Sequence, residues 1–343
     1  MFRKNSAKHS SNPILGLFRM ILSLIMFGLL SFGVYLAYVQ FSGADPLKMD
    51  PKALVLSVAK SDEAVKLVDK VFGFQLPKSI VGENSIIPTT LTPKKEENQA
   101  KETLFSFMLI ADSHNENNYL NRSLIQAKSM KPNLAFAIGL GDYTEVGTIA
   151  ELQKAKNEFD KNALRYFVIP GDHDLWDARN RQLNPAVNFQ EVFGVNYQSF
   201  TYQGVKFILI DNSDSYRGIS DEQMKWLTTE LENTKLAGES LKGILVFLHI
   251  PLSHPSSDHV MGRVEKDLRG QAKTLGSLLK EYGVRKVFAG DVHFFTEYVD
   301  PENSLSMVTV GALASQRNTQ APRFAIVNVY EDGNVGVEDI EIR

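Results

Sequence analysis

The chain has 343 residues, of which 43% are hydrophobic, so it is long and apolar enough to bury a sizeable core. Its formal net charge is −3 and no basic cluster accompanies the motifs described below, which argues against nucleic acid as a partner. The chain contains no cysteine, so disulfides and cysteine-ligated zinc are excluded, and the redox compartment stays open.

The beginning of the chain is typical of a membrane anchor. Met20–Val39 carries no charge, and as a helix it would be about 30 Å long, the thickness of a bilayer core. The tail before it, residues 1–19, is basic and has no acidic residue, so the positive-inside rule favours a cytoplasmic N-terminus. We therefore expect a single-pass protein of the cell membrane with its C-terminal domain outside the cytoplasm. The alternative is secretion after signal cleavage, because Ser42-Gly43-Ala44 offers small residues to a peptidase.

Residues 40–103 have the composition of a stalk and linker. Ser61 can cap a short helix that Gly73 would end. The mixed-charge stretch Lys94–Glu102 follows two prolines and is typical of a solvated linker.

From residue 104 to residue 343 the sequence alternates strand-like apolar runs with amphipathic helices. Ser220-Asp221-Glu222-Gln223 is a capping box that begins one such helix. Gln203-Gly204 and Asp332-Gly333 each separate two strand-like runs, and the second pair is a strong hairpin signal. The pattern predicts an α/β domain in which two mixed β-sheets pack face to face with helices on the outside.

Five of the apolar runs end directly on side chains that can bind a metal ion. In open α/β sheets ligands bind beyond the carboxyl ends of the strands, so five such endings predict a polynuclear metal site. The endings are Asp112-Ser113-His114 after Leu104–Ala111, Gly141-Asp142 after Leu134–Leu140, Gly171-Asp172-His173-Asp174 after Tyr166–Ile169, His249 after Ile244–Leu248, and Gly290-Asp291-Val292-His293 after Val287–Ala289.

This ordered set of motifs resembles the five motifs of the calcineurin-like metallophosphoesterases. The resemblance extends over residues 104–343 and implies a four-layer αββα sandwich, which agrees with the alternation of strands and helices. It also implies hydrolysis of a phosphoester by a dinuclear metal centre with a metal-bridging hydroxide, because two cations lower the pKa of a shared water and neutralise phosphoryl oxygens.

The resemblance implies two groups of metal ligands that share one aspartate. The first metal ion would be held by Asp112, His114 and His293. The second would be held by Asp172, His249 and Asp291. Asp142 would belong to both groups, since a carboxylate has two oxygens and can bind two cations.

The resemblance also assigns a general acid. His173 would protonate the leaving group, and Asp174 would orient its imidazole. An imidazole suits this role because its unperturbed pKa lies close to neutral pH.

Two positions depart from the family pattern: Asp172 replaces an asparagine and Asp291 replaces a histidine. Both replacements are still ligands, and they raise the number of carboxylates in the site from two to four. The added charge should favour Mn²⁺, Mg²⁺ or ferric iron over Zn²⁺ at the second position. The replacements either retune the site or impair it.

The sequence thus predicts a membrane-tethered, metal-dependent phosphoester hydrolase. The alternative is a catalytically impaired domain of the same fold that acts as a tethered binding or scaffolding module. The substrate could be a phosphorylated small molecule, lipid or protein, and the loops Leu175–Asn196 and Ser253–Arg269 are expected to select it. His254 and His259, in the second loop, are expected to face the surface or the substrate rather than a metal ion.

Overall fold

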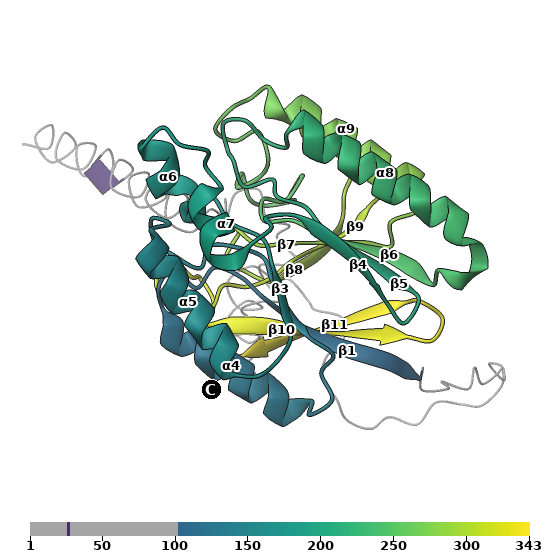
Figure 1. Cartoon of the computed structure of the whole chain (residues 1–343), viewed down its shortest axis with the longest axis horizontal. Helices are drawn as coiled ribbons and strands as arrows, with labels where there is room; N and C mark the ends of the chain where they lie inside the picture. Colours follow the sequence, from purple (N-terminus) through teal and green to yellow (C-terminus); the bar gives the residue numbers. More distant parts are fainter. Residues whose placement is uncertain (1–25, 28–101) are drawn as a thin grey trace, which may run out of the picture.

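The computed structural model describes residues 26–27 and 102–343 of the chain (Figure 1). The predicted tail, the rest of the Met20–Val39 anchor and nearly all of the predicted stalk lie outside these residues. Met26 and Phe27, inside the predicted anchor, are helical and exposed. Among the residues described, no helix combines the length and the apolar character needed to cross a membrane.

The first sheet has five strands in the order β11-β10-β1-β2-β3. The central strand β1 pairs in parallel with β2 and antiparallel with β10, so the sheet is mixed. The strands are β1 (Thr103–Ile110), β2 (Ala137–Gly139), β3 (Tyr166–Val168), β10 (Arg323–Tyr330) and β11 (Val335–Glu341).

The second sheet has six strands in the order β4-β5-β6-β7-β9-β8. Strands β5, β6, β7 and β9 are parallel, and the edge strands β4 and β8 run antiparallel to their neighbours. The strands are β4 (Gln198–Tyr202), β5 (Val205–Leu209), β6 (Gly243–Phe247), β7 (Lys286–Ala289), β8 (Thr296–Val299) and β9 (Ser306–Thr309).

The helices cover the outer faces of the two sheets (Figure 1). Helices α4, α5 and α7 pack on the first sheet, and α8 and α9 pack on the second. The helices are α4 (Asn117–Met130), α5 (Ile149–Lys161), α6 (Trp176–Asn180), α7 (Val187–Phe193), α8 (Asp221–Ala237) and α9 (Leu268–Glu281). The expected arrangement of two mixed sheets flanked by helices is confirmed.

Aromatic side chains fill the space between the two sheets. Phe107 of β1 meets Phe207 of β5 edge to face at 5.4 Å between ring centroids. Phe247 and Phe288, on neighbouring strands of the second sheet, are stacked at 5.2 Å. All four side chains are fully buried, and such rings contribute a large share of the burial energy of a core. This central layer fixes the two sheets against each other and therefore the relative positions of their strand ends.

Helix α8 shows a departure from the predicted capping box. Ser220 Oγ accepts the hydrogen bond from the Gln223 backbone N–H, as expected. The Gln223 side chain, however, binds the backbone N–H and C=O of Asp211 at 2.8 Å each instead of returning to the cap. The amide thereby ties the start of α8 to the end of β5, because it can donate and accept at once.

Candidate metal centre

The motif residues lie in the turns that follow the parallel strands of both sheets. Asp112, Asp142 and Asp291 all have left-handed backbone, with φ of 56°, 56° and 63°. Residues other than glycine rarely adopt this conformation, and aspartate is one of those that tolerate it best. Backbone hydrogen bonds between the turns hold it in place, as from Asp112 N–H to Gly141 C=O at 3.0 Å. Clustered strain of this kind is typical of functional sites.

Four of the predicted ligands form a first group: Asp112, His114, Asp142 and His293. The Nε2 atoms of His114 and His293 lie 3.3 Å apart. His114 Nε2 is 3.6 Å from Asp142 Oδ2, and His293 Nε2 is 3.9 Å from Asp112 Oδ1. The structure therefore brings together the set of side chains that was expected to hold the first metal ion.

Asp172, His249 and Asp291 form a second group. His249 Nε2 lies 3.9 Å from Asp172 Oδ1 and 3.5 Å from Asp142 Oδ1. Asp142 thus presents one oxygen to the first group and the other to the second. This is the geometry expected of a carboxylate that bridges two cations.

The histidine tautomers leave lone pairs that a cation would satisfy. His249 Nδ1 donates to the Leu140 carbonyl at 2.7 Å, and His293 Nδ1 donates to the Arg317 carbonyl at 3.1 Å. In the neutral ring the Nε2 atom then carries a lone pair, and that of His249 faces two carboxylates. His249 Nε2 and Asp112 Oδ2 are buried and have no hydrogen-bond partner in the part of the chain that the structure describes. The lone pair of His249 Nε2 and the carboxylate oxygens that it faces repel each other. Only a proton or a cation between them removes this repulsion, so the residues present fit metal ions.

Burial dominates the electrostatics of the group. It raises the pKa of Asp142 well above its ordinary value, although the nearby His249 opposes the shift. It lowers the pKa of His114 well below the usual range, so this imidazole is neutral and able to bind metal. For His249 burial acts in the same direction, but the surrounding carboxylates, Asp142 first among them, together outweigh burial and raise the pKa. Proton and cation therefore compete for the same atoms.

Gly171 is required by the closeness of two turns. A Cβ atom at this position would lie 2.1 Å from Asp142 Oδ1 and 2.2 Å from the Asp142 backbone nitrogen. Any side chain would displace the shared aspartate, Asp142, so only glycine fits at the position before Asp172.

The position of His173 agrees with a place beside the metal groups, and the expected contact with Asp174 is wrong. His173 Nδ1 hydrogen-bonds to the Glu145 carbonyl at 2.8 Å, and its ring stacks on Trp176. The two oxygens of Asp174 instead accept hydrogen bonds from the backbone N–H groups of Tyr143, Thr144 and Gly171 and from the Thr144 hydroxyl. Asp174 is fully buried and ties the turn after β2 to the turn after β3. Asp174 is a structural residue, because it is the acceptor for backbone N–H groups that would otherwise be buried without a partner. The His173 imidazole is already oriented by the Glu145 carbonyl.

The residue that positions the His249 turn, Asn212, is not among the residues predicted from the sequence. Asn212 Oδ1 accepts hydrogen bonds from the backbone N–H groups of His249 and Ile250, at 3.0 and 3.1 Å. Its amide donates to the Ile250 carbonyl at 2.6 Å. The signal was present, because the apolar run of β5 also ends on polar residues, Asp211-Asn212-Ser213. These residues support the site through the backbone.

His259 lies closer to the candidate ligands than expected. Its Nδ1 is 3.5 Å from Asp291 Oδ1. Arg263 Nη1 lies 2.6 Å from His259 Nε2, and because arginine can only donate, Nε2 must be the acceptor. The proton of the neutral ring is then on Nδ1 and points at Asp291. Burial opposes ionisation of Asp291, but His259, together with His249 and His293, outweighs burial and holds the pKa of that carboxyl below its usual range.

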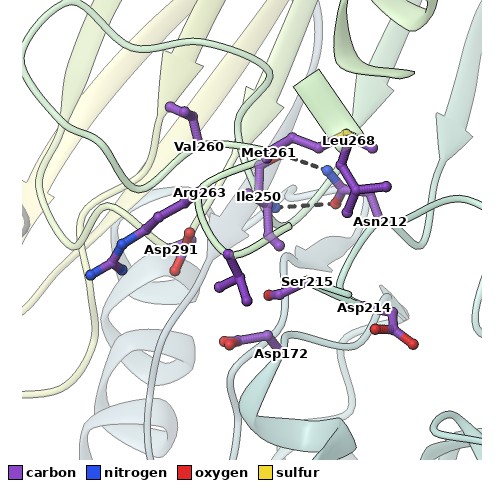
Figure 2. A pocket seen from close by; sticks show the side chains of 12 residues that line it. Asp172, Asn212, Asp214, Ser215, Ile250, Val260, Met261, Arg263, Leu268 and Asp291 are labelled. Carbon is purple, nitrogen blue, oxygen red and sulfur yellow. Dashed lines mark hydrogen bonds between the residues drawn. The ribbon is translucent and has the colours of Figure 1, made fainter. Parts of the chain in front are cut away.

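A small cavity of about 50 Å³ opens beside the second group (Figure 2). Asp172 and Asp291 line it on one side, and Ile250, Met261 and Leu268 provide an apolar wall. Residues 260–264 of the predicted specificity loop also line it. A larger recess of about 800 Å³ is lined by residues 182–186 of the other predicted loop, and Asp214 lines both spaces. Both loops therefore lie where a bound substrate could contact them.

Comparison with curated proteins gives a relative whose name describes phosphodiester chemistry. The probable glycerophosphodiester phosphodiesterase GpdQ of Arcobacter nitrofigilis is 27% identical over 180 residues. The match covers 51% of this chain and 62% of the relative, so the chain spans less than two thirds of that protein.

Two solved structures share the fold. One is GAP50, the anchor in the inner membrane complex of Plasmodium, with a TM-score of 0.50 and 14% identity over 71% of this chain and 86% of that one. The other is the purple acid phosphatase PPD1 of yellow lupin, also with a TM-score of 0.50 and 14% identity, over 70% of this chain and 52% of that one. At this level of identity the likeness concerns the fold alone.

The family expected from the motifs is confirmed by a family model. The model for calcineurin-like phosphoesterases matches residues 105–295, which is more than half of the 343 residues and includes every motif described above. The chain belongs to the calcineurin-like phosphoesterase family, whose members depend on metal ions.

Proposed function

We propose that the protein is a metal-dependent phosphoester hydrolase with a dinuclear centre. The observation that carries the proposal is the position of Asp142 between the two groups of ligands. Its Oδ2 lies 3.6 Å from His114 Nε2 and its Oδ1 lies 3.5 Å from His249 Nε2. Membership of the family supports the same activity.

When bound, a pair of metal ions would supply an activated water and neutralise charge on the phosphoryl oxygens. Asp112, His114 and His293 would hold one ion, Asp172, His249 and Asp291 the other, and Asp142 both. The chain itself contributes the rigidity of the turns, which fixes these atoms before substrate arrives. His173 would donate a proton to the leaving oxygen, since its ring lies edge-on to His114 at 4.7 Å between centroids.

We propose a phosphodiester as the substrate class. Four carboxylates facing two divalent cations give a formal charge near zero, so the site attracts a dianionic monoester less than a less acidic site would. A diester carries a single negative charge and loses less by binding there. The name of the Arcobacter relative points to the same class.

We propose that the second position prefers Mn²⁺, Mg²⁺ or iron to Zn²⁺. Two of its three side chains are carboxylates, Asp172 and Asp291, and hard cations favour oxygen ligands. His259 and Arg263 support this assignment, because the imidazole that faces Asp291 keeps the carboxylate ionised.

The experiment uses the full chain purified in detergent, stripped of metal and reloaded separately with Mn²⁺, Mg²⁺ or Zn²⁺. We expect about two equivalents of bound metal and hydrolysis of a diester such as bis(p-nitrophenyl) phosphate in preference to its monoester. Asp142→Asn should reduce the metal content at both positions and abolish turnover, because one oxygen of the bridge is lost. Asp160→Asn, which changes an exposed ion pair on α5, is the matched control.

The outcomes separate the proposal from its alternative. A chain that binds no metal and hydrolyses no ester would be a tethered binding or scaffolding module. Two bound metal ions and near-normal turnover in Asp142→Asn would contradict the dinuclear centre.

We also propose that the domain is tethered to the cell membrane and faces away from the cytoplasm. The support is the uncharged run Met20–Val39 and the basic tail before it. The substrate would then be a phosphorylated small molecule, lipid or protein of that compartment.

A further inference from the structure

Arg317 lies at the edge of the metal groups on a loop that joins β9 to β10. The loop is fixed by its neighbours: the backbone N–H groups of Ser315 and Gln316 donate to Glu116 Oε1 at 2.8 and 3.1 Å. Arg317 has a left-handed backbone with φ of 64°, and its carbonyl accepts the hydrogen bond from His293 Nδ1. The backbone of Arg317 therefore helps to hold the candidate ligand His293 in place, and this role does not depend on the Arg317 side chain.

The guanidinium group has two partners beside the metal groups. Arg317 Nη2 donates to Glu145 Oε2 at 2.7 Å. Arg317 Nη1 lies 3.4 Å from His173 Nε2. The Arg317 and Glu145 side chains are each about 40% exposed, at 40% and 39%, so this ion pair is open to water and contributes little to stability. A pair of this kind exchanges its partners easily.

The contact with His173 conflicts with the role of that residue as an acid. Arginine has only donors, so His173 Nε2 accepts from Nη1. His173 Nδ1 is already occupied by the Glu145 carbonyl. As long as the guanidinium remains in place, Nε2 cannot donate to a leaving oxygen. Arg317 must leave His173 before the acid can act.

The charge of the site requires a cation at this edge. Asp112, Asp142, Asp172 and Asp291 balance two divalent ions, and Glu145 adds a further carboxylate within 4.8 Å of His114 and His173. An anionic phosphate approaching such a site gains little from the metal pair alone. A guanidinium supplies the missing positive charge and matches phosphate oxygens with two parallel donors.

We infer that Arg317 binds the phosphoryl group of the substrate and exchanges Glu145 and His173 for it. The arriving phosphate draws the guanidinium away, which leaves Nε2 of His173 free to take up a proton from water and pass it to the leaving oxygen. The reaction itself is unchanged: the bond from phosphorus to the leaving oxygen breaks, a water oxygen bonds to phosphorus, and one proton of that water ends on the leaving group. This inference rests on the proposed function for the identity of the site, and adds the residue that recognises its substrate.

The test compares Arg317→Gln, Arg317→Lys and Glu145→Gln with the control Arg165→Gln in the full chain. Arg165 lies before β3, at the opposite end of the strand from the motif residues, and its replacement removes the same charge from the molecule. The main-chain contact to His293 survives each replacement at position 317. Two quantities are measured: the dissociation constant of inorganic phosphate by calorimetry, and the KM and kcat for a diester.

Arg317→Gln should raise the phosphate dissociation constant and KM by about tenfold or more, with unchanged metal content. Arg317→Lys should recover part of the loss, since lysine keeps the charge but not the paired donors. Glu145→Gln should tighten phosphate binding several-fold, because the competing carboxylate is gone. Arg165→Gln should resemble the wild type.

Equal phosphate affinity and KM in wild type and Arg317→Gln would overturn the inference. A tenfold weaker affinity for phosphate in Arg165→Gln would also overturn it, because the effect would then come from the overall charge of the protein. A wild type that hydrolyses no ester, yet binds phosphate in a manner that depends on Arg317, would remove the hydrolase and leave the phosphate site in place.

Discussion

At the scale of single residues, the carboxylate of Asp291 depends on the imidazole behind it. His259 directs its Nδ1 proton at Asp291 Oδ1, and Arg263 fixes that tautomer from the other side of the ring. Partners of this kind orient a metal ligand and keep it in the charged form.

His259→Ala should therefore weaken binding at the second metal position by about 10–100-fold and leave the first position nearly unchanged. Titration of the metal-free full chain with Mn²⁺, followed by electron paramagnetic resonance, measures the two classes of site. His259→Gln is the matched variant, because its amide can still donate to Asp291 and should restore part of the affinity. Equal weakening of both positions would show that His259 acts on the fold and not on Asp291.

His254, five residues earlier, has a different role. Its Nδ1 accepts hydrogen bonds from the backbone N–H groups of Ser256 and Ser257, at 3.2 and 3.0 Å. The ring also contacts Phe294 and Tyr298 edge to face. Burial lowers the pKa of His254 to about 4. A proton on Nδ1 would break both loop hydrogen bonds, so the folded protein keeps this ring neutral.

The sign of the pH effect follows from that shift. The folded pKa lies below the unfolded value of about 6.5, so the contribution of neutral His254 is complete above pH 6.5 and is lost as the pH falls through about 4. The loss amounts to about 3 kcal/mol at most, because one pKa unit corresponds to about 1.4 kcal/mol. His254→Asn can keep the two loop hydrogen bonds and does not titrate. The difference in urea stability between pH 7.5 and pH 4.5 should be smaller in this variant than in the wild type, and an equal difference would contradict the assignment.

At the scale of elements, the turns after β2 and β3 are joined by Asp174. Its carboxylate is the acceptor for three backbone N–H groups and one hydroxyl. An asparagine at this position would have only one oxygen to accept these hydrogen bonds. Its NH2 group, which can only donate, would face backbone N–H groups that also donate.

Asp174→Asn should lower the free energy of unfolding by about 2–4 kcal/mol, since buried N–H groups lose their acceptor. Its residual activity should respond to leaving-group quality as that of the wild type does, because the His173 ring is held by the Glu145 carbonyl. His173→Asn is the contrasting variant: it should keep the stability and lose turnover most for poor leaving groups. A selective loss for poor leaving groups in Asp174→Asn would restore the predicted role in orienting His173.

The strands and their polar endings could be predicted from sequence because apolar runs and turn residues are local signals. Asp332-Gly333 does join β10 to β11, and Gln203-Gly204 does join β4 to β5. The partners of polar side chains could not be predicted, because they depend on which turns meet in space. Gln223 binds Asp211 instead of its own cap, and Asp174 binds Tyr143 and Thr144 instead of its neighbour His173. The motif residues converge as expected, and Asn212 could have been found in the same way, because it follows the apolar run of β5. His259 and Arg317 belong to no local pattern.

At the scale of the whole molecule, each candidate ligand group draws on both sheets. Asp112, His114 and Asp142 follow strands of the first sheet, and His293 follows a strand of the second. In the other group Asp172 follows β3, while His249 and Asp291 follow β6 and β7. A metal ion in either position would therefore join the two sheets at one end, as the aromatic layer joins them along their length.

The predicted anchor is tested on the whole chain. If Met20–Val39 is retained, the mature protein should keep residues 1–19 and stay with the membrane fraction after washing at alkaline pH or high salt. N-terminal sequencing and immunoblotting of the washed fractions provide the measurement. A mature protein that begins at Asp45 would instead establish cleavage after Ser42-Gly43-Ala44.

The order of the first sheet also has a consequence for how the protein is made. Strand β1 is the first strand of the domain to be synthesised, yet one of its two neighbours is β10, and Ser106 hydrogen-bonds to Asn328 across 222 positions of sequence. Until the ribosome has released Arg323–Tyr330, the centre of this sheet is an open edge. The nascent domain therefore stays incomplete for almost the whole of translation, because the long-range pairing of β1 with β10 can form only near its end. A chain that ends before residue 323 should therefore be an aggregation-prone fragment that binds chaperones, and not a smaller folded and active domain.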